Sequence, residues 1–376
     1  MAGNLRNWAL QRLVAFGLVI GALLYGDRVR GGLVTYLPPL AGDTHSAVSD
    51  VNDAGVAIGI SYSLTVTEPF LGQGPSHGVR WSPTGAATAL GALGGTQSTP
   101  FSINNSGKIV GWAQIPSGDR PGATYVAPGP WQQLPNVGEA TAINENGIIA
   151  GNTAAAGVSR NAYIYTAAGV VVNLGSFSTF GSNAKDINIS DVVVGYSVVD
   201  SVNRRRAFRY TSATGIQTLA GANIFFDSAA EAINDSGVIV GTGDNTGFRW
   251  TNGQLAALPS GRPYDINEAG YVVGELTIAP GGAALWRPNN TLVNLNTWLD
   301  QTSPAEGALW TLTNAVSISN TGLIVGYGTY AGSPGVPSGQ RGYMLNASAL
   351  VPEPGMLGVV LLGLVAAARP RRPRRA

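Results

Sequence analysis

The chain has 376 residues and no cysteine, which excludes disulfides, thiolate metal sites and a cysteine nucleophile. Glycine is abundant, with 52 residues, and only 11% of residues are charged, a composition typical of short strands joined by tight turns. Residues 31–354 carry 13 basic and 20 acidic residues, so we expect no binding to nucleic acid.

The chain begins with the features of an export signal. Arg6 and Arg12 precede an uncharged apolar run from Leu13 to Tyr25. At about 1.5 Å per residue this run would span roughly 20 Å, which is short of the ~30 Å core of a bilayer. We therefore interpret residues 1–26 as a signal peptide. Because no small-residue cleavage site follows, an uncleaved N-terminal anchor stays open as the alternative.

One motif, Ile-Asn-x-x-Gly-x-Ile-Val-Gly, occurs seven times in the middle of the chain. The first copy, DVNDAGVAIG, ends at Gly59, and the last, SISNTGLIVG, ends at Gly326. The Asn position is filled by Asn52, Asn104, Asn144, Asn188, Asn234, Asn267 and Ser319. The copies recur at intervals of 33 to 52 residues, on average 44.5. A period of about 40–45 residues with strand-like content is typical of β-propeller blades.

Each copy of the motif predicts a β-hairpin. Asn favours the first position of a type I turn, because its side chain can bond the backbone ahead of it. The fourth residue must then take φ > 0, which Gly does without steric cost. In the fourth copy Asp191 replaces this Gly, and Asp tolerates positive φ better than most residues.

Two further strand-like segments follow each hairpin, which makes the four strands of a propeller blade. One is apolar and aromatic, as in RAFRYT at 206–211, and the other is leucine-rich, as in IQTLAG at 216–221. The seventh repeat lacks its leucine-rich strand, whereas an unassigned one, GGLVTYLPPLAG at 31–42, precedes the first repeat. The sequence therefore predicts an all-β, seven-bladed β-propeller over residues 31–350, closed by its N-terminal strand.

The repeat resembles the HAF repeat, an extracellular repeat of bacteria named after a His-Ala-Phe tripeptide. The tripeptide occurs loosely, as HGV at 77–79 and RAF at 206–208, and the Asn-x-x-Gly-x-x-x-Gly signature matches more closely. The resemblance covers residues 31–345. It implies the architecture and an extracellular location, and it implies no particular biochemical activity.

The hairpin strands are expected to be innermost, with mostly small side chains around the axis. Asp50, Asp186 and Asp265 are the candidate axial residues among them. The small residues are Ser49, Ser102, Ala142, Ala232 and Ser317. Paired carboxylates suit glycosidic chemistry when they lie about 5–10 Å apart, so these three are the visible candidates for a glycan-active enzyme. The sequence has no G-x-S-x-G, P-loop, H-E-x-x-H or S-x-x-K motif, and we predict no catalytic residue and no enzyme.

The remaining candidate sites have simpler interpretations. The two histidines, His45 and His77, are too few for most histidine metal sites. The segment DVNDAG at 50–55 resembles the start of a calcium loop, but the turn interpretation covers all seven copies. We therefore predict no cofactor or metal, with calcium as the minor alternative. The basic run 204–206 is interpreted as a solvated loop, or else as a contact for an anionic polysaccharide.

The C-terminus has three parts in order. A Val-Pro-Glu-Pro motif at 351–354 precedes an apolar stretch at 355–368 and an arginine-rich end. Arginines do not cross a bilayer cheaply, so this end stays in the cytoplasm and everything before it lies outside the inner membrane. The residues of this signal are Val351, Pro352, Glu353, Pro354, Arg371 and Arg372.

This tail resembles the PEP-CTERM sorting signal of Gram-negative bacteria. The resemblance covers residues 351–376 and implies removal of the tail by an exosortase, in a host that makes exopolysaccharide. We expect a short hydrophobic helix at each terminus, with a transmembrane helix at 355–368, and membrane contact through both. The precursor would be anchored in the inner membrane, and the mature protein would be periplasmic, on the cell surface or extracellular.

Together these features predict an exported, non-catalytic surface or extracellular-matrix protein, associated with exopolysaccharide or biofilm. A propeller enzyme acting on glycans is one alternative, and a lectin that binds through blade loops is another. The longest predicted loops are 60–76, 112–122 and 327–340. An axial cluster of carboxylates, arginine and tyrosine would favour the enzyme, whereas an axis lined by Ser and Ala would oppose it.

Overall fold

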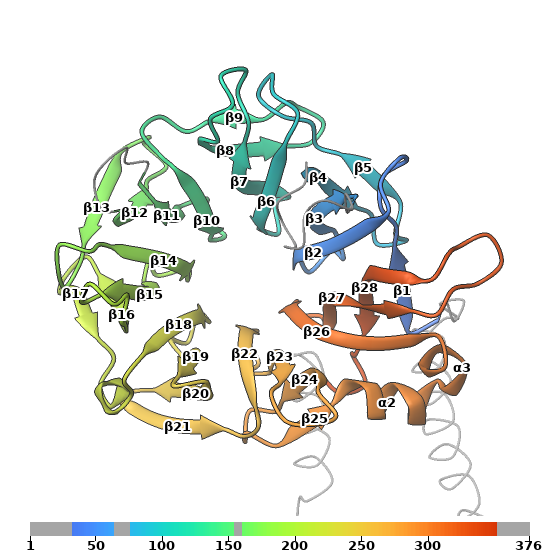
Figure 1. The fold of residues 1–376 in the computed structure, drawn as a ribbon. Helices are drawn as coiled ribbons and strands as arrows, with labels where there is room; N and C mark the ends of the chain where they lie inside the picture. The colour runs from blue at the N-terminus through green and yellow to red at the C-terminus, as the bar shows by residue number, and fades with distance from the viewer. Residues whose placement is uncertain (1–31, 64–75, 154–159, 352–376) are drawn as a thin grey trace, which may run out of the picture. The chain divides into compact units, whose positions relative to one another are not determined.

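The computed structural model describes residues 32–63, 76–153 and 160–351. From Val34 onward these residues form seven sheets, each of four antiparallel strands. Figure 1 shows the sheets as blades around one axis, with one strand of each sheet nearest the axis. The predicted all-β, seven-bladed propeller is confirmed.

Within blades 1 to 6 the strands follow one another outward in chain order, from β2 to β5 in blade 1 and from β22 to β25 in blade 6, whereas in blade 7 β26, β27 and β28 are followed by β1. The innermost strands are β2 (His45–Val51), β6 (Ser98–Ile103), β10 (Glu139–Ile143), β14 (Ser182–Ile187), β18 (Ser228–Ile233), β22 (Gly261–Ile266) and β26 (Trp310–Ile318). The second strands are β3 (Ala57–Tyr62), β7 (Lys108–Ala113), β11 (Ile149–Asn152), β15 (Val193–Val198), β19 (Ile239–Gly243), β23 (Val272–Leu276) and β27 (Leu323–Tyr330).

The outer half of each blade holds the aromatic and leucine-rich segments. The third strands are β4 (Ser76–Trp81), β8 (Gly122–Val126), β12 (Ala162–Tyr165), β16 (Arg205–Thr211), β20 (Thr246–Thr251), β24 (Gly282–Trp286) and β28 (Gly339–Asn346). The outermost strands are β5 (Ala87–Ala89), β9 (Gln132–Gln133), β13 (Val171–Gly175), β17 (Gly215–Thr218), β21 (Gln254–Leu258), β25 (Leu292–Asn294) and β1 (Val34–Leu37). The predicted order, with leucine-rich strands outermost, is confirmed (Figure 1).

The N-terminal strand closes the ring, as predicted. β1 pairs antiparallel with β28, from Val34 opposite Leu345 to Leu37 opposite Gly342. The same segment also contacts blade 1, because the Ser46 hydroxyl donates to the Leu37 carbonyl oxygen at 2.7 Å. Leu37 is completely buried. The first described strand thus joins the last blade to the first.

Each innermost strand carries a β-bulge, and the bulge explains the second glycine of the motif. In blade 1 the register shifts between Val48 and Asp50, so that Ser49 is the extra residue opposite β3. The other six blades shift at the equivalent place. A Cβ atom at Gly59 would collide with the carbonyl oxygen of Ala47, and the corresponding glycines of the other blades face the same obstacle. Only glycine leaves room for this backbone approach.

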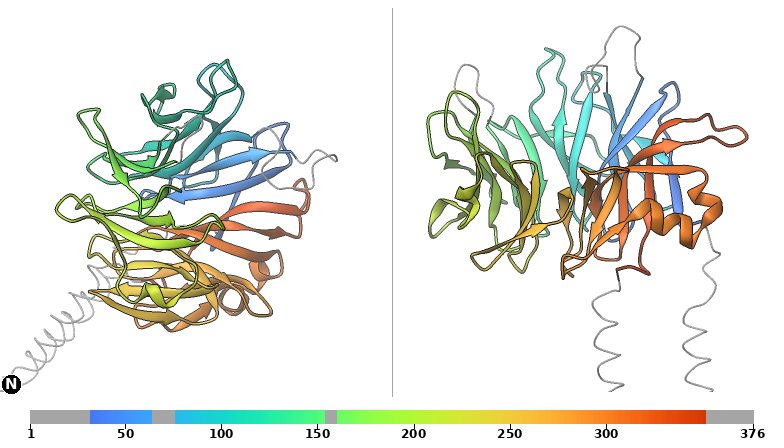
Figure 2. Two further views of the ribbon diagram at one scale, coloured as in Figure 1. Left: turned by 60° about the vertical axis from the view of Figure 1, so that its left-hand side comes forward. Right: turned by 60° about the horizontal axis from the view of Figure 1, so that its bottom comes forward.

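The turns of the motif adopt the predicted conformation. The fourth residue has φ of 75–80° in the six copies with glycine, and φ of 58° at Asp191. All seven turns lie on one face of the ring, here called the turn face, because every innermost strand ends in one. The opposite face, where the innermost strands begin, is here called the loop face. Figure 2 shows the strands running through the thickness of the ring between these faces.

The aromatic strands supply much of the packing between neighbouring sheets. Trp81 and Trp286 are fully buried, and the indole nitrogen of each donates to a backbone carbonyl oxygen, at 2.8 Å to Pro38 and 3.0 Å to Pro259. These rings therefore pack between neighbouring sheets and are unavailable for stacking on sugars.

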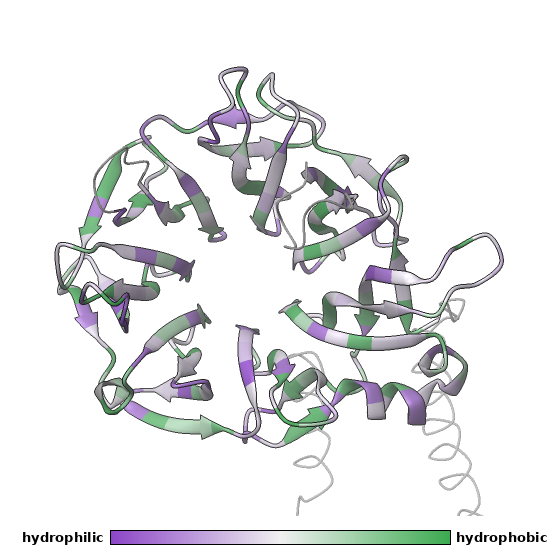
Figure 3. Cartoon of the chain, viewed as in Figure 1, coloured by the Kyte–Doolittle hydropathy of each residue, from purple (hydrophilic) through white to green (hydrophobic). Residues whose placement is uncertain are grey.

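Two helices between blades 6 and 7 were not predicted. α2 (Leu295–Thr302) begins at Asn294, whose side chain accepts hydrogen bonds from the backbone of Asn296 and Thr297. α3 (Pro304–Gly307) follows directly, and a 3-10 helix, η1 (Ala222–Ile224), precedes β18. Hydrophilic and hydrophobic residues alternate along α2, with its leucines buried (Figure 3).

The other predicted loops and terminal segments have different outcomes. The loop predicted at 327–340 is shorter, because β27 extends to Tyr330 and β28 begins at Gly339. The expected terminal helices, and the sorting residues after Val351, lie outside the described residues. Within the described ranges, no helix is both long and apolar enough to cross a membrane.

Candidate binding site

The asparagines of the motif link the blades on the turn face. Asn52 Oδ1 accepts from the backbone N–H of Val56 at 3.0 Å, as expected for the turn. Its Nδ2 donates to the carbonyl oxygen of Asn104 in the next blade at 3.2 Å, and this link recurs through six blades at 2.9–3.3 Å. Ser319 has no amide to continue the series between blades 7 and 1, where the backbone N–H of Asn320 donates to Asp53 Oδ1 at 2.7 Å as part of a second ring of bonds.

A second ring of hydrogen bonds runs beside the first. The backbone N–H of Asp53 donates to Asn105 Oδ1 at 2.9 Å, and that of Asn105 donates to Glu145 Oε1 at 3.0 Å. In blade 4 the equivalent residue is Ile189, which has no side-chain acceptor, and Asn146 donates to its carbonyl oxygen instead. The DVNDAG segment thus takes part in joining blades, a use that accounts for its polar residues without a metal.

Asp50, Asp186 and Asp265 occupy equivalent positions beside the bulges of blades 1, 4 and 6. One oxygen of each carboxylate accepts from the following residue's backbone N–H. The other accepts from the innermost strand of the next blade at 2.8–2.9 Å, as Asp186 does from Ile233. Asp50 also accepts from the Ser317 hydroxyl at 2.6 Å. The predicted axial residues therefore act as bridges between blades.

The surroundings of these carboxylates favour their protonated forms. Desolvation by the protein, together with the nearby charge of Asp265, raises the pKa of Asp50 to about 6. Desolvation likewise raises the pKa of Asp186 to about 8, and the charges of Asp265 and Asp50 add to this. The pKa of Asp265 is raised by desolvation as well, against the effect of its backbone donors.

A stability measurement can check these raised pKa values. The folded Asp186 has a higher pKa than the unfolded one, so the folded state holds more protons and unfolding free energy falls as pH rises. Because the pKa rises from about 4 to about 8 on folding, we expect a loss of up to about 5 kcal/mol between about pH 4 and pH 8, which urea titrations at a series of pH values measure. Asp186→Ser, which introduces the residue found at this position in blades 2 and 7, should flatten the dependence. The exposed Asp119→Ser is the control, and an unchanged slope in Asp186→Ser would contradict the assignment.

The extra residue of the bulge varies among blades and brings polar side chains together in blades 4 to 6. Lys185 and Glu231 form a salt bridge at 3.3 Å across neighbouring innermost strands. Tyr264 follows at the equivalent position in blade 6, and Asn314 Nδ2 lies 3.5 Å from its hydroxyl. The axis therefore combines carboxylates with small side chains, and a lysine and a tyrosine stand beside them.

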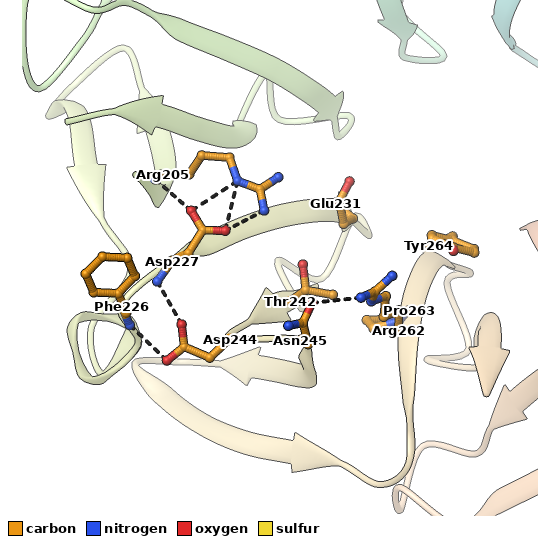
Figure 4. Close-up of a pocket in the computed structure, with 10 residues that line it drawn as sticks. All are labelled: Arg205, Phe226, Asp227, Glu231, Thr242, Asp244, Asn245, Arg262, Pro263 and Tyr264. Carbon is orange, nitrogen blue, oxygen red and sulfur yellow. Dashed lines mark hydrogen bonds and ion pairs between the residues drawn. The ribbon is translucent and has the colours of Figure 1, made fainter. Parts of the chain in front are cut away.

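A pocket of about 510 Å³ opens beside these residues, over blades 4 to 6 (Figure 4). Its lining comes from the start of β16, the β17–β18 connection, β18, the end of β19, the β19–β20 turn and β22. Figure 4 shows Arg205 and Asp227 on one side, Arg262 and Tyr264 on the other, and Thr242 between them. All these segments belong to the loop face, opposite the asparagine turns.

The charged groups of the pocket are paired within the protein. Arg205 binds Asp227 through its Nε and Nη2 atoms, and this pair raises the pKa of Arg205. Burial alone would raise the pKa of Asp227, but the hydrogen bonds and charge of Arg205 outweigh it and lower that pKa. On the other side, Arg262 Nη2 donates to Asn245 Oδ1 at 2.7 Å, and its Nη1 lies 3.6 Å from Glu275.

The basic run that the sequence singled out is also engaged. Arg204 pairs with Asp200 at 2.9 Å, and Arg206 Nη1 donates to the carbonyl oxygen of Phe225 at 2.6 Å. With Arg205 bound to Asp227, all three guanidinium groups have partners in the protein. The run therefore orders the connection leading into blade 5, a role that neither sequence interpretation included.

The two histidines lie apart from the pocket. His77 Nδ1 is 2.9 Å from Asp43 Oδ2, and His45 stacks on the ring of Tyr62 with 5.4 Å between centroids. Burial, followed by the charge of Arg341, lowers the pKa of His45. Among the described residues, no group of three or more His, Asp or Glu side chains is placed to bind a metal ion.

Sequence comparison finds no matching protein family and no matching characterised protein. Solved structures share the fold. The β-propeller domain of the Trilobed protease from Pyrococcus furiosus, which has an open velcro topology, matches with a TM-score of 0.50 and 11% identity over 80% of this chain and 94% of its own. TolB from Acinetobacter baumannii matches with a TM-score of 0.42 and 10% identity over 58% of each chain.

A further match is the puromycin-hydrolyzing peptidase of Mycobacterium tuberculosis, with a TM-score of 0.42 and 15% identity over 82% of this chain and 51% of that one. At 11% identity the match to the Trilobed protease domain shows the propeller fold alone. Unlike the open propeller of the Trilobed protease, this ring is closed by the pairing of β1 with β28.

Proposed function

We propose that this protein is an exported, non-catalytic protein of the cell surface or extracellular matrix that associates with exopolysaccharide. Support for export comes from the apolar segment at 1–26 and from the ordered tail motif at 351–376. Support for a non-catalytic role comes from the axis of the propeller, where the visible carboxylate candidates already have structural partners.

The hydrogen bonds of Asp50, Asp186 and Asp265 support the proposed non-catalytic role. Each carboxylate uses both oxygens to accept backbone N–H groups, one of them from the neighbouring blade. A general acid or nucleophile needs an oxygen directed at its substrate, so groups held in this way are better suited to joining strands. The named peptidases share only the fold, which does not transfer their activity.

Removal of the tail tests the proposed export. In a host with an exosortase, we expect the wild-type chain to lose its C-terminal segment and to leave the cytoplasm. The variant Pro352→Ala/Glu353→Ala should accumulate as the larger precursor in the inner membrane, because the recognition motif is gone. Fractionation, immunoblotting and mass spectrometry of the C-terminus measure both outcomes.

Ser348→Ala, a change just before the tail motif, serves as the matched control and should be processed normally. Recovery of full-length wild-type protein from the cytoplasm, with its tail intact, would contradict the proposed export.

A further inference from the structure

We propose that the loop-face pocket over blades 4 to 6 is a binding site for a neutral oligosaccharide, such as a segment of a matrix glycan. This proposal rests on the proposed association with exopolysaccharide, and adds its site and ligand class. The pocket volume of about 510 Å³ lies within the range of about 300–1,000 Å³ that is usual for small-ligand sites.

The balance of charge in the pocket favours a neutral ligand. Two guanidinium groups, of Arg205 and Arg262, face the carboxylates of Asp227, Glu231 and Asp244. Arg205 is paired with Asp227, and Glu231 with Lys185 of the neighbouring innermost strand in blade 4. A ligand with net charge would have to separate one of these pairs or lie beside a like charge, and either change is costly in a partly buried site.

Hydroxyl groups match what the pocket presents. A sugar hydroxyl both donates and accepts, so adjacent hydroxyls can bond a carboxylate and a guanidinium at the same time. Within the described residues Glu231 pairs with Lys185 through Oε2 at 3.3 Å, which leaves acceptor capacity on its other oxygen. Thr242 lies between the two arginines and adds a hydroxyl of its own (Figure 4).

Asp244 holds the β17–β18 connection in place beside the pocket. Its two oxygens accept from the backbone N–H groups of Phe226 and Asp227, both at 2.9 Å. These bonds fix the β17–β18 connection against the β19–β20 turn, so that Asp227 is presented to the pocket from a constrained backbone. Polar groups positioned in this way lose little freedom when a ligand binds.

An exposed aromatic residue lies at the outer edge of the pocket, with its ring on the far side of Asp227 from Arg262 (Figure 4). Phe226 is 63% exposed, which is unusual for so large an apolar side chain, and it lines the pocket beside Arg205. The guanidinium of Arg204 lies 5.2 Å from the centre of this ring and supports it. Sugars have apolar C–H faces as well as hydroxyls, so a ring next to paired charges suits both parts of such a ligand.

Direct binding measurements test this site. The full chain in detergent would be titrated calorimetrically with cello-, laminari-, malto- and manno-hexaose, and with an anionic oligomannuronate for comparison. We expect at least one neutral hexasaccharide to bind, and Glu231→Gln and Arg262→Gln each to weaken that binding by about tenfold or more, because each removes a charge-assisted hydrogen bond.

Matched controls come from a second Arg–Glu pair, between Arg160 and Glu139 at 3.4 Å, which is not part of the pocket. Arg160→Gln and Glu139→Gln should bind as the wild type does, and thermal unfolding confirms that all four variants fold. Absence of binding to every neutral hexasaccharide, tighter binding of oligomannuronate, or unchanged binding by both pocket variants would overturn the proposal.

The same experiments separate this inference from the proposed function. Cosedimentation with the host's exopolysaccharide is measured beside the titrations. If the wild type and the pocket variants cosediment equally well, the pocket is not the binding site, whereas the proposed association with exopolysaccharide is supported. If the chain releases new reducing ends from a bound hexasaccharide, the non-catalytic role falls, whatever the pocket binds.

Discussion

Removal of residues 32–40 is expected to abolish the stable fold. The deletion takes away β1, leaves the edge of β28 unpaired, and exposes the apolar surface that Leu37 covers. It also leaves Trp81 Nε1, which donates to Pro38, without its acceptor inside the protein. We expect aggregation or an early, non-cooperative urea transition by tryptophan fluorescence, where the wild type unfolds cooperatively.

A point variant measures the contribution of one buried side chain of β1 while leaving the strand itself in place. Leu37→Ala should lower the unfolding free energy by about 2–5 kcal/mol, as is usual for a fully buried leucine. Thr35→Ala, two residues earlier on the same strand and partly exposed, should change it by less than about 1 kcal/mol. If the deletion variant unfolded with nearly wild-type stability, β1 would not be what closes the ring.

The architecture was predictable because the repeat is a periodic signal. Seven copies with a strand-like pattern and a regular spacing admit few folds, and the missing leucine-rich strand of the last repeat identified β1 as its replacement. The asparagine turns were predictable as well, because their backbone requirement is local. Their links from blade to blade were not, since these depend on how closely the blades approach each other.

Elements that occur only once could not be predicted from the repeat, because they have no periodic signal. The helix α2 sits in one of the two longest intervals between repeats and has no counterpart in the described parts of the other blades. Its signals were nevertheless present, with Asn294 as the N-cap and leucines four residues apart at 295 and 299. A search for helix caps within the long interval would have found it.

The sequence indicated some residues of the candidate pocket, but not that they lie together. Arg205 belonged to a run that attracted attention by charge, whereas Glu231 and Tyr264 each occupy the bulge position of their blade. That position is held in four other blades by Ser49, Phe101, Thr141 and Val316. The charged residues at 185 and 231 and the tyrosine at 264 are therefore the signal that could have pointed to the pocket. The bulge itself was needed to recognise the position, and no sequence pattern showed it.

The two glycines of one motif should respond very differently to the same substitution. In blade 2, a Cβ atom at Gly111 would collide with the carbonyl oxygen of Thr99, a backbone atom that cannot move without breaking the bulge. Gly107 in the turn has open space around it, and only its φ of 80° opposes a side chain. We expect Gly111→Ala to cost about 3 kcal/mol or more, and Gly107→Ala about 1–2 kcal/mol.

Gly107→Asp sharpens this comparison, because blade 4 already has an aspartate at the equivalent turn position, at φ of 58°. Since Asp adopts left-handed backbone more readily than Ala, Gly107→Asp should be at least as stable as Gly107→Ala in urea unfolding, although it is larger. At position 111 aspartate should be no more stable than alanine, because the Thr99 carbonyl oxygen leaves no room for any side chain. If alanine lowered the unfolding free energy equally at positions 107 and 111, the close backbone approach at the bulge would not explain why the motif ends in glycine.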